Sequence, residues 1–287
     1  MSVRRVQHAL AAELGPEAMV EHRPNHTGAG KLSFAVRLGA RRLWAKVAAD
    51  ADEEVALETW AEVAGLLAER HGAPELLDVL SVDGHTALLF PYVDAPPATR
   101  ATLHERHEEA AELLAGLHAD RELAERLGEP TTTARCFREV WLVRFEADLD
   151  VIEGYIAKDL HAYLTDQVDA LGDLIDDLDD EVHSAVHGDP WHENLLLAPD
   201  RMWLLDWEDL TVGDPVLDDA ILRHDALGTD PHLWPDTPSD RVALRALMFD
   251  GVVDSAADWI ENTDPLVRRQ KEAAYLAELE TYRAAFS

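Results

Sequence analysis

The chain has 287 residues with 57 acidic and 25 basic side chains, which gives a formal net charge of −32 at pH 7. This charge argues against nucleic acid as a partner, because phosphate backbones are bound by concentrated lysine and arginine. The sequence has no run of about 18 apolar residues and no secretory leader pattern, and Cys136 is its sole cysteine. We therefore expect a cytoplasmic protein with no membrane contact and no internal disulfide.

The first part of the chain has the pattern of a small antiparallel sheet with one main helix. Apolar residues alternate with period two in residues 32–38, as in a strand with one buried face. Further strands are predicted at residues 41–48, 75–80 and 85–90. Asp83-Gly84 is the expected hairpin turn between the last two strands. Residues 52–70 carry an imperfect apolar stripe at helical spacing, which predicts an amphipathic helix.

Two polar features lie in this first part. Residues 25–31 form a stretch that contains Gly28 and Gly30, which suits either a hairpin loop facing phosphate or an ordinary glycine turn. Lys46 lies on a predicted strand between apolar neighbours, in a chain with only four lysines. It is either a functional ammonium group held in place or a solvated strand lysine.

A change of composition follows Pro91. Asp94-Ala95-Pro96-Pro97 is stiff and predicts a domain boundary, so residues 1–93 and 94–287 are expected to form separate parts. The second part is predicted to be mostly helical, with helices at residues 104–127, 138–155, 160–178, 241–261 and 265–285.

The strongest chemical signal begins at His187 and has the sequence HGDPWHEN. Residues 195–197 and 202–205 are predicted strands of a hairpin, so Asn194 begins the hairpin and Asp206 ends it. In an antiparallel pair such ends return to within about 5 Å of each other, close enough to share a hard cation such as Mg²⁺. Asp189 lies on the loop entering the hairpin, where it can approach a substrate hydroxyl. This layout is typical of magnesium-dependent phosphoryl transfer.

These residues also resemble a known family. HGDPWHEN fits the HGDxxxxN loop of the aminoglycoside phosphotransferase and choline kinase superfamily, and LLDWEDLTVGDPVLDDA resembles its metal-binding segment with the GDPxxD continuation. The resemblance implies a bilobal, protein-kinase-like α+β fold. It has a small N-lobe of antiparallel sheet and one main helix (residues 1–93). The larger, mostly helical C-lobe (residues 94–287) carries the catalytic hairpin.

The resemblance also implies roles for the residues around the hairpin. Asp189 would orient or deprotonate the acceptor hydroxyl, while Asn194 and Asp206 would hold the magnesium ion that bridges the nucleotide phosphates. His187 and Asp218 would brace the catalytic loop from behind.

In the first part, the resemblance implies a nucleotide site. The loop with Gly28 and Gly30 would cover the phosphates, and Lys46 would contact the α and β phosphates. Glu58, or Glu54 one turn earlier, would hold Lys46 by an ion pair; a solvated helix face is the alternative for both glutamates. Adenine would be read by the carbonyl of Pro91 and the N–H of Val93.

We therefore expect an O-phosphotransferase that uses ATP or GTP and Mg²⁺ to phosphorylate a hydroxyl of a small molecule. An aminoglycoside-like or other cationic antibiotic is the leading acceptor, because acidic clefts attract polycations. The acidic composition is equally explained by general solubility or by the source organism. A metabolic kinase for choline, a sugar or an amino-acid derivative is the alternative within the fold. Outside it, His187, Asp189 and His192 could serve a metal-dependent hydrolase, or the protein could bind ATP without catalysis. The sequence leaves the acceptor, the nucleotide preference and the oligomeric state open.

Overall fold

A computed structural model describes residues 2–23, 32–178 and 180–286. By internal packing, the chain divides into two compact units, Met1–Gly128 with Ala185–Thr211 and Glu129–Ser184 with Val212–Ser287. The expected boundary after residue 93 follows the end of the sheet instead, and that division into lobes stays a proposal. β8 (Ser184–Val186) and β11 (Thr211–Gly213) lie where the chain passes from one unit to the other.

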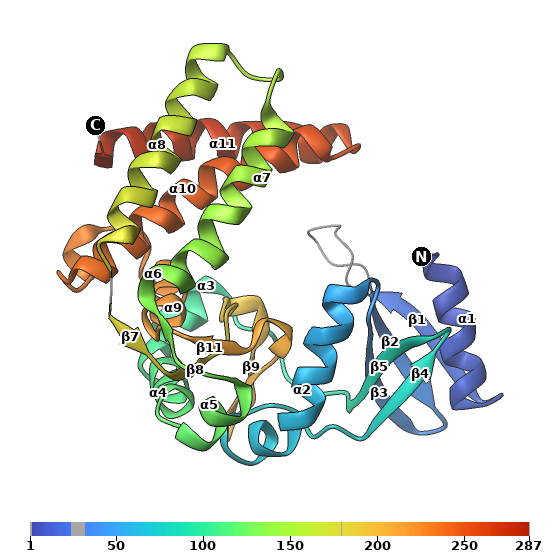
Figure 1. Ribbon diagram of the computed structural model, residues 1–287. Helices are drawn as coiled ribbons and strands as arrows, with labels where there is room; N and C mark the ends of the chain where they lie inside the picture. The colour runs from blue at the N-terminus through green and yellow to red at the C-terminus, as the bar shows by residue number, and fades with distance from the viewer. Residues whose placement is uncertain (1, 24–31, 179, 287) are drawn as a thin grey trace. The chain divides into compact units, whose positions relative to one another are not determined.

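The first unit contains a sheet, its helices and the predicted hairpin (Figure 1). Its elements are α1 (Val3–Leu14), β1 (Ala18–Arg23), β2 (Leu32–Leu38), β3 (Arg41–Val47), α2 (Ala51–Arg70), β4 (Asp78–Val82), β5 (His85–Pro91), α3 (Arg100–Glu105), α4 (His107–His118), α5 (Arg121–Leu127), the 3-10 turn η2 (His192–Asn194), β9 (Leu195–Leu197), β10 (Met202–Leu204) and the 3-10 turn η3 (Trp207–Asp209).

The second unit is mostly helical. Its elements are β6 (Thr131–Thr132), α6 (Thr133–Phe137), the π-helical turn η1 (Arg138–Leu142), α7 (Val143–Ile152), α8 (Lys158–Asp176), β7 (Glu181–Val182), α9 (Val216–Leu227), the 3-10 turn η4 (Pro231–Leu233), α10 (Pro238–Glu261) and α11 (Pro265–Phe286). The α+β class expected from the sequence is confirmed.

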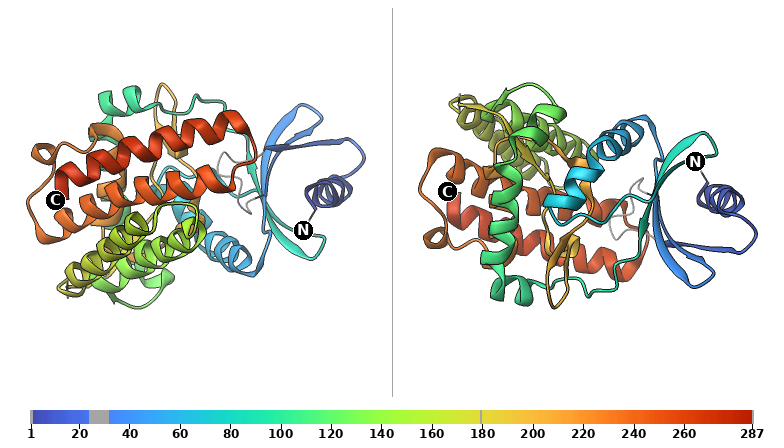
Figure 2. Two further views of the ribbon diagram at one scale, coloured as in Figure 1. Left: turned by 90° about the horizontal axis from the view of Figure 1, so that it is seen from above. Right: turned by 90° about the horizontal axis from the view of Figure 1, so that it is seen from below.

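The sheet of the first unit has the strand order β1-β2-β3-β5-β4, with antiparallel neighbours throughout. The alternation of β2 and β3 separates two faces. Phe34 and Ala45 lie on one face, where they form a buried core with Val6 and Leu10 of α1. The other face carries Lys46. Figure 2 shows the sheet between α1 and α2.

Helix α2 packs on the Lys46 face of the sheet. Asp50 caps its first turn by accepting from the backbone N–H groups of Asp52 and Glu53, a typical N-cap arrangement. Trp60 of α2 stacks on Phe90 of β5 with ring centroids 4.7 Å apart. This stacked pair seats the helix against the strand that leads out of the sheet.

The predicted Asp83-Gly84 hairpin turn is confirmed. Both residues have positive φ, 55° and 86°, as a two-residue type I′ turn requires. The register places Val82 opposite His85, so β4 runs from Asp78 to Val82 rather than over residues 75–80. The predicted bounds were wrong because the turn, and not the apolar run, sets where pairing begins.

The helix expected over residues 104–127 is in fact three helices. Arg106 leaves helical geometry, with φ −120° and ψ 20°, between α3 and α4. Asp120 then starts α5 as an N-cap that accepts from the N–H of Leu123 at 3.1 Å. A capping aspartate competes with helix continuation for backbone donors, which explains the break.

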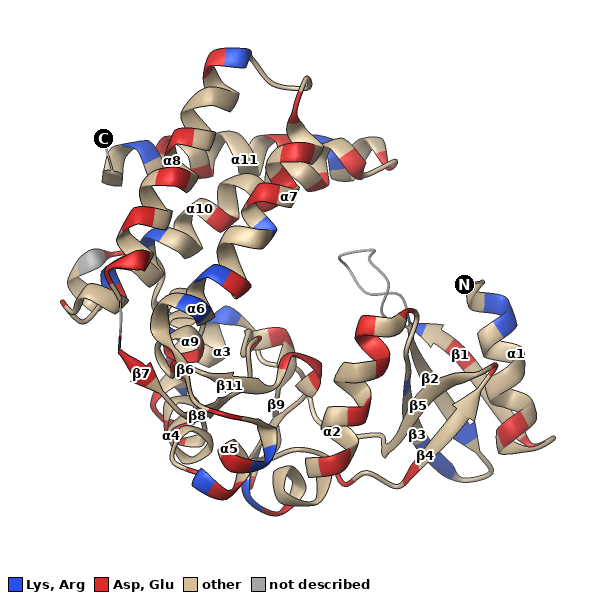
Figure 3. Ribbon diagram, viewed as in Figure 1, with Lys and Arg blue, Asp and Glu red and all other residues tan. Residues whose placement is uncertain are grey.

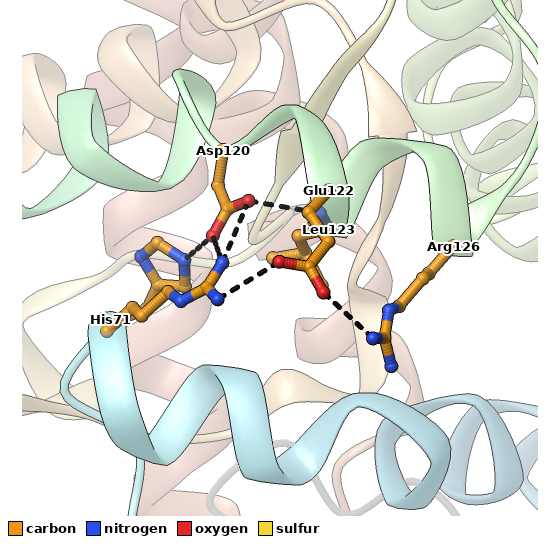
Figure 4. A network of polar contacts seen from close by, with 6 residues as sticks. His71, Asp120, Glu122, Leu123 and Arg126 are labelled. Atoms are coloured by element: carbon orange, nitrogen blue, oxygen red, sulfur yellow. Dashed lines mark hydrogen bonds and ion pairs between the residues drawn. The ribbon is translucent and has the colours of Figure 1, made fainter.

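A polar network ties the end of α2 to the start of α5 (Figure 4). His71 Nε2 lies 2.9 Å from Asp120 Oδ2, and Arg70 contacts both Asp120 and Glu122. Burial lowers the pKa of His71 despite its aspartate partner, so the imidazole is neutral at pH 7 and donates from Nε2. The network holds the C-terminal end of α2 in one place.

In the second unit, aromatic side chains join three helices. Phe249 of α10 lies edge-on to Phe145 of α7 at 5.1 Å and to Tyr282 of α11 at 5.4 Å between ring centroids.

Acidic side chains are spread over both units rather than gathered in one segment (Figure 3). Among the described helices, none combines the length and apolar character needed to cross a membrane.

Candidate active site

The predicted hairpin between Asn194 and Asp206 is present. β9 and β10 pair in antiparallel register with Leu195 opposite Leu204. One step further, the N–H of Leu205 donates to the carbonyl of Asn194 at 2.8 Å. Because the two chain ends stay paired beyond the strands, Asn194 and Asp206 come to the same end of the hairpin.

Asn194 and Asp189 contact each other directly. The Asn194 Nδ2 group donates to the backbone carbonyl of Asp189 at 2.8 Å and to its carboxylate Oδ2 at 2.9 Å. These two bonds fix the orientation of the amide, whose Oδ1 atom remains as a hard acceptor. The second bond also gives the Asp189 carboxylate a neutral N–H donor.

His187 supports this loop from the interior. Its side chain is fully buried and lies edge-on to Trp207, with ring centroids 4.7 Å apart. The Nδ1 atom accepts from the backbone N–H of Asp189 at 3.2 Å, so Nε2 carries the proton and donates to the carbonyl of Leu205 at 2.8 Å. One imidazole thus joins the loop that carries Asp189 to the end of the hairpin.

This geometry counts against a metal site built from His187, Asp189 and His192. Both ring nitrogens of His187 are engaged by backbone groups. Across the described ranges of the chain, no three or more His, Cys, Asp or Glu side chains are grouped as metal ligands. The hydrolase alternative therefore lacks its ligand set.

Gly188 allows the catalytic loop to approach the turn η3. Its φ is 87°, and a Cβ atom added there would lie 2.7 Å from the carbonyl oxygen of Asp209 and 2.8 Å from its Cβ. Any side chain would therefore displace one of the two segments. The glycine of the HGD motif is a steric requirement of this site.

Lys46 is buried against two carboxylates. Its Nζ lies 2.6 Å from Asp206 Oδ1 and also contacts Glu208 Oε2. The side chains of Lys46, Asp206 and Glu208 are 7%, 30% and 8% exposed. Burial alone lowers the pKa of Lys46, but Asp206 and Glu208 raise it above its ordinary value. The group is therefore an ammonium ion at neutral pH.

The backbone of Asp206 turns its carboxylate toward Lys46. It adopts the left-handed conformation, with φ 61° and ψ 64°, which aspartate tolerates better than most non-glycine residues. The next residue, Trp207, is fully buried and donates from Nε1 to the carbonyl of Leu204 at 2.8 Å. This anchor fixes the chain direction immediately after Asp206.

The expected ion pair between Lys46 and Glu58 does not form. Glu58 is exposed on α2, one residue beyond the buried Leu57 and so about 100° around the helix from it. Glu54 instead accepts from the N–H of Thr86 at 2.8 Å and from its hydroxyl. The prediction was wrong because the apolar face of α2 packs inward, and this orientation leaves Glu58 on the exposed side of the helix.

A cavity of about 230 Å³ lies beside Lys46 and Asp206. Its walls are mainly apolar and aromatic, and the side chains that line it include Trp44, Phe90 and Leu196. Such walls suit a flat heteroaromatic group, and Lys46 and Asp206 add two charged side chains to the lining.

Pro91 and Val93 line the same cavity. The N–H of Tyr92 between them donates to the carbonyl of Arg42 at 3.0 Å and thereby faces β3. In the trans peptide between Pro91 and Tyr92, the carbonyl of Pro91 points opposite to this N–H and so faces away from β3.

The remaining predicted residues lie elsewhere. Gly28 and Gly30 fall outside the described residues. Asp218 is fully buried in the first turn of α9, in the second unit; its role as a brace of the catalytic loop stays a proposal.

Two residues of the site were not predicted. Glu208 contacts Lys46, and Trp44 lines the cavity two residues before Lys46 on the same face of β3. A period-two reading of β3 would have identified Trp44. No local pattern marks Glu208 among so many acidic residues.

Comparison with known proteins identifies the family of the chain. The model of the phosphotransferase enzyme family matches residues 21–285. No curated protein matches the chain by sequence.

Solved structures share the fold at low sequence identity. A thermostable mutant of aminoglycoside phosphotransferase APH(4)-Ia, in a ternary complex with AMP-PNP and hygromycin B, is 18% identical with a TM-score of 0.58, covering 98% of this chain and 99% of that one. A choline/ethanolamine kinase family protein from Mesorhizobium loti is 17% identical with a TM-score of 0.57, covering 98% and 92%. Spectinomycin phosphotransferase, in complex with ADP and spectinomycin, is 10% identical with a TM-score of 0.55, covering 91% and 88%. These neighbours have the protein-kinase-like fold, and with the family match over residues 21–285 the chain belongs to the phosphotransferase enzyme family.

Proposed function

We propose that this phosphotransferase uses ATP and Mg²⁺ to phosphorylate a hydroxyl group of a small cationic molecule, with an aminoglycoside-like antibiotic as the leading acceptor. One observation carries the proposal. Lys46, Asp189, Asn194 and Asp206 all belong to one compact unit, and Lys46 and Asp206 border a cavity suited to a nucleotide base.

The nucleotide part of the proposal starts from the cavity. Its aromatic wall at Trp44 suits stacking on adenine. Pro91 and Val93 line this cavity, and the proposed pairing is of the Pro91 carbonyl and the Val93 N–H with the donor and acceptor on one edge of adenine. Lys46, which lines the same cavity, supplies the charge that phosphates require.

Asn194 and Asp206 are the proposed magnesium ligands. An amide oxygen and a partly exposed carboxylate are the hard donors that Mg²⁺ prefers, and this ion usually keeps several waters beside one or two protein carboxylates. The donor set therefore fits the ion. When bound, magnesium neutralises charge on the nucleotide phosphates.

Asp189 is the proposed partner of the acceptor hydroxyl. Its carboxylate is held by the Asn194 amide, and its backbone N–H is held by His187. A carboxylate with this support can accept the hydroxyl proton and orient the oxygen for in-line attack. Positioning of this kind supplies much of the rate in phosphoryl transfer.

The acceptor class is inferred from charge. A net charge of −32 attracts polycations and disfavours anionic acceptors. The two structural neighbours crystallised with antibiotics, hygromycin B and spectinomycin, agree with this class. A metabolic kinase is the second candidate, because a choline/ethanolamine kinase family protein matches the fold to a similar degree.

A screen for ADP release tests the proposal. The purified protein is given Mg²⁺-ATP with a panel of aminoglycosides, other cationic antibiotics, choline, ethanolamine and sugars. We expect an acceptor-dependent rate with at least one cationic antibiotic, confirmed by mass spectrometry of the phosphorylated product. A rate only with choline or ethanolamine would favour the metabolic kinase instead.

The Asp189→Asn variant serves as the blank. Removal of the carboxylate lowers kcat by about 10³-fold, while ATP still binds, because a positioned base contributes about 10²- to 10⁴-fold. Glu193→Gln is the matched control, since Glu193 is an exposed acid on the same loop, and it keeps the wild-type rate. Equal turnover of Asp189→Asn and wild type would remove Asp189 from the mechanism.

A further inference from the structure

The ammonium group of Lys46 requires a fixed carboxylate partner while phosphates enter and leave the site. It is buried, and a buried charge without a partner strongly destabilises the folded protein. Two carboxylates contact it, Asp206 and Glu208. They differ in exposure, in what they border and in what else the proposed function asks of them.

Asp206 cannot be the permanent partner under the proposed function. Its side chain is 30% exposed and borders the nucleotide cavity, where it is the proposed ligand of magnesium. An acid that binds the metal gives up much of its attraction for Lys46. The ion pair seen between Asp206 and Lys46 therefore belongs to the protein without nucleotide.

The proposed function assigns no metal to Glu208. Its side chain is 8% exposed and lies at a small separate cavity that Lys46, Ser33 and Leu57 also line. Glu208 is not among the residues that line the base cavity. A carboxylate in this place can keep its contact with Nζ while the ammonium group faces phosphate.

Three glutamates in the first half of α2 are either hydrogen-bonded elsewhere or exposed. Glu53 accepts from the backbone N–H of Ala49 at 2.7 Å, Glu54 accepts from Thr86, and Glu58 is exposed. Glu53 also lines the small cavity, which makes it the one competitor on the helix. Its hydrogen bond ties it to the start of α2 rather than to Lys46.

The turn that carries Glu208 is rigid. Trp207 is buried, donates to the carbonyl of Leu204 and lies edge-on to His187. On the other side, Asp209 is packed against Gly188 so closely that no Cβ fits between them. Glu208 is therefore fixed by the same contacts that fix the catalytic loop.

We propose that Glu208 is the positioning residue for Lys46, in the role expected of a glutamate on α2. This inference rests on the nucleotide part of the proposed function. It links the lysine to the turn after the hairpin, so the residues that meet phosphate, metal and hydroxyl share one support. Helix α2 contributes packing to the site but not the ion pair.

A double-mutant cycle on nucleotide affinity tests this role. Calorimetry measures the binding of Mg²⁺-AMP-PNP to wild type, Glu208→Gln, Lys46→Met and the double variant, with folding checked by circular dichroism. Glu208→Gln weakens binding about tenfold, because Lys46 then has only the aspartate that the metal must take. In the Lys46→Met background, the same substitution has no further effect. Additive losses would overturn the proposal.

Three further variants sharpen the test. Glu208→Asp keeps the charge and restores part of the affinity, whereas a role in packing alone would not depend on charge. Glu58→Gln, on the exposed face of α2, binds like wild type. If Glu53→Gln rather than Glu208→Gln shows the coupling to Lys46, the partner is on the helix and the proposal is wrong.

A metal role for Glu208 gives a different result. If Glu208 were a magnesium ligand, the Glu208→Gln substitution would raise the Mg²⁺ concentration that gives half-maximal nucleotide binding. If Glu208 positions Lys46, the substitution leaves this concentration unchanged. A raised Mg²⁺ requirement would therefore overturn the proposal. No acceptor is needed, so failure of the acceptor screen counts against the proposed function alone. Failure of wild type to bind Mg²⁺-AMP-PNP would overturn both.

Discussion

Buried charge is arranged differently in two regions of the molecule. Around Lys46, one buried cation meets two carboxylates at contact distance. Between α7, α10 and α11 of the second unit, carboxylates crowd with too few cations. Asp148 and Glu278 each have a buried oxygen without a hydrogen-bond partner among the described residues.

The difference is visible in the protonation of the two regions. Lys46 keeps its charge because Asp206 and Glu208 outweigh its burial. In the second unit, burial raises the pKa of Asp148 to about 6, and it also raises the pKa values of Asp254 and Glu278. In the first region the ammonium charge of Lys46 is balanced by two carboxylates and can also interact with a charged ligand. In the second region the ionised carboxylates lower the free energy of unfolding.

The largest effect is expected at the compensated region. Asp206→Ala removes a proposed magnesium ligand and weakens Mg²⁺-AMP-PNP binding on the order of 100-fold, since even outer partners of a metal site are worth about 10- to 100-fold. Binding of ADP in EDTA changes far less, because Lys46 keeps Glu208. Calorimetry under both conditions measures the difference. A similar loss with and without metal would show that Asp206 acts through Lys46 and not through magnesium.

Asp200→Ala is the control for this variant. Asp200 is an exposed acid in the turn of the same hairpin, so its removal changes net charge by the same amount. Wild-type affinity in Asp200→Ala would confine the effect to the site.

A smaller effect is expected from the steric contact that holds the compensated region together. Gly188→Ala places a Cβ atom 2.7 Å from the Asp209 carbonyl oxygen and lowers the free energy of unfolding by about 2 to 3 kcal/mol, as strain added to positive φ does. Urea denaturation measures the loss. Phosphoryl transfer falls with it, because the catalytic loop and η3 move apart.

Gly84→Ala separates the two causes of this loss. Gly84 has nearly the same φ, 86° against 87°, but nothing lies within 4 Å of its Cβ position. It reports the backbone cost alone, about 1 kcal/mol. If both variants lose equal stability, the close approach of Gly188 to Asp209 has no energetic weight.

Local patterns in the sequence predicted much of the fold. The bounds of β2 and β9 follow from apolar alternation and short apolar runs, and both hairpin turns follow from Asp, Gly and Pro at their positions. Helix α1 was not predicted, although Val3, Val6 and Leu10 have helical spacing. Its apolar face is narrow and becomes meaningful only against the sheet that it covers.

In the candidate site, too, local spacing predicted some residues, whereas others depend on the tertiary fold. Fixed spacing indicated Asp189, Asn194 and Asp206 because all three lie within one short hairpin segment. The partner of Lys46 could not be found in this way, since Glu208 lies 162 residues further along the chain. Which face of α2 packs inward decides where its glutamates point, and that depends on the stacking of Trp60 on Phe90.

The smallest effect, and the one that tests the uncompensated region, is expected from Asp148→Asn. Burial raises the folded pKa of Asp148 from 3.8 to about 6, so the ionised form is less favourable in the folded than in the unfolded state. The cost is absent below pH 3.8, grows through the window up to about pH 6, and is complete above it. The neutral asparagine removes this cost and raises Tm at pH 8 by about 2 to 4 °C.

The pH dependence identifies the cause. The gain in Tm from Asp148→Asn shrinks toward zero at pH 4, where wild-type Asp148 is already protonated when folded. Asp150→Asn, at an exposed position on the same helix, shows no such dependence. A gain of equal size at pH 4 and pH 8 would trace the effect to packing instead. The contrast between a compensated and an uncompensated region would then lose its energetic basis, because the crowded carboxylates of the second unit would cost nothing when ionised.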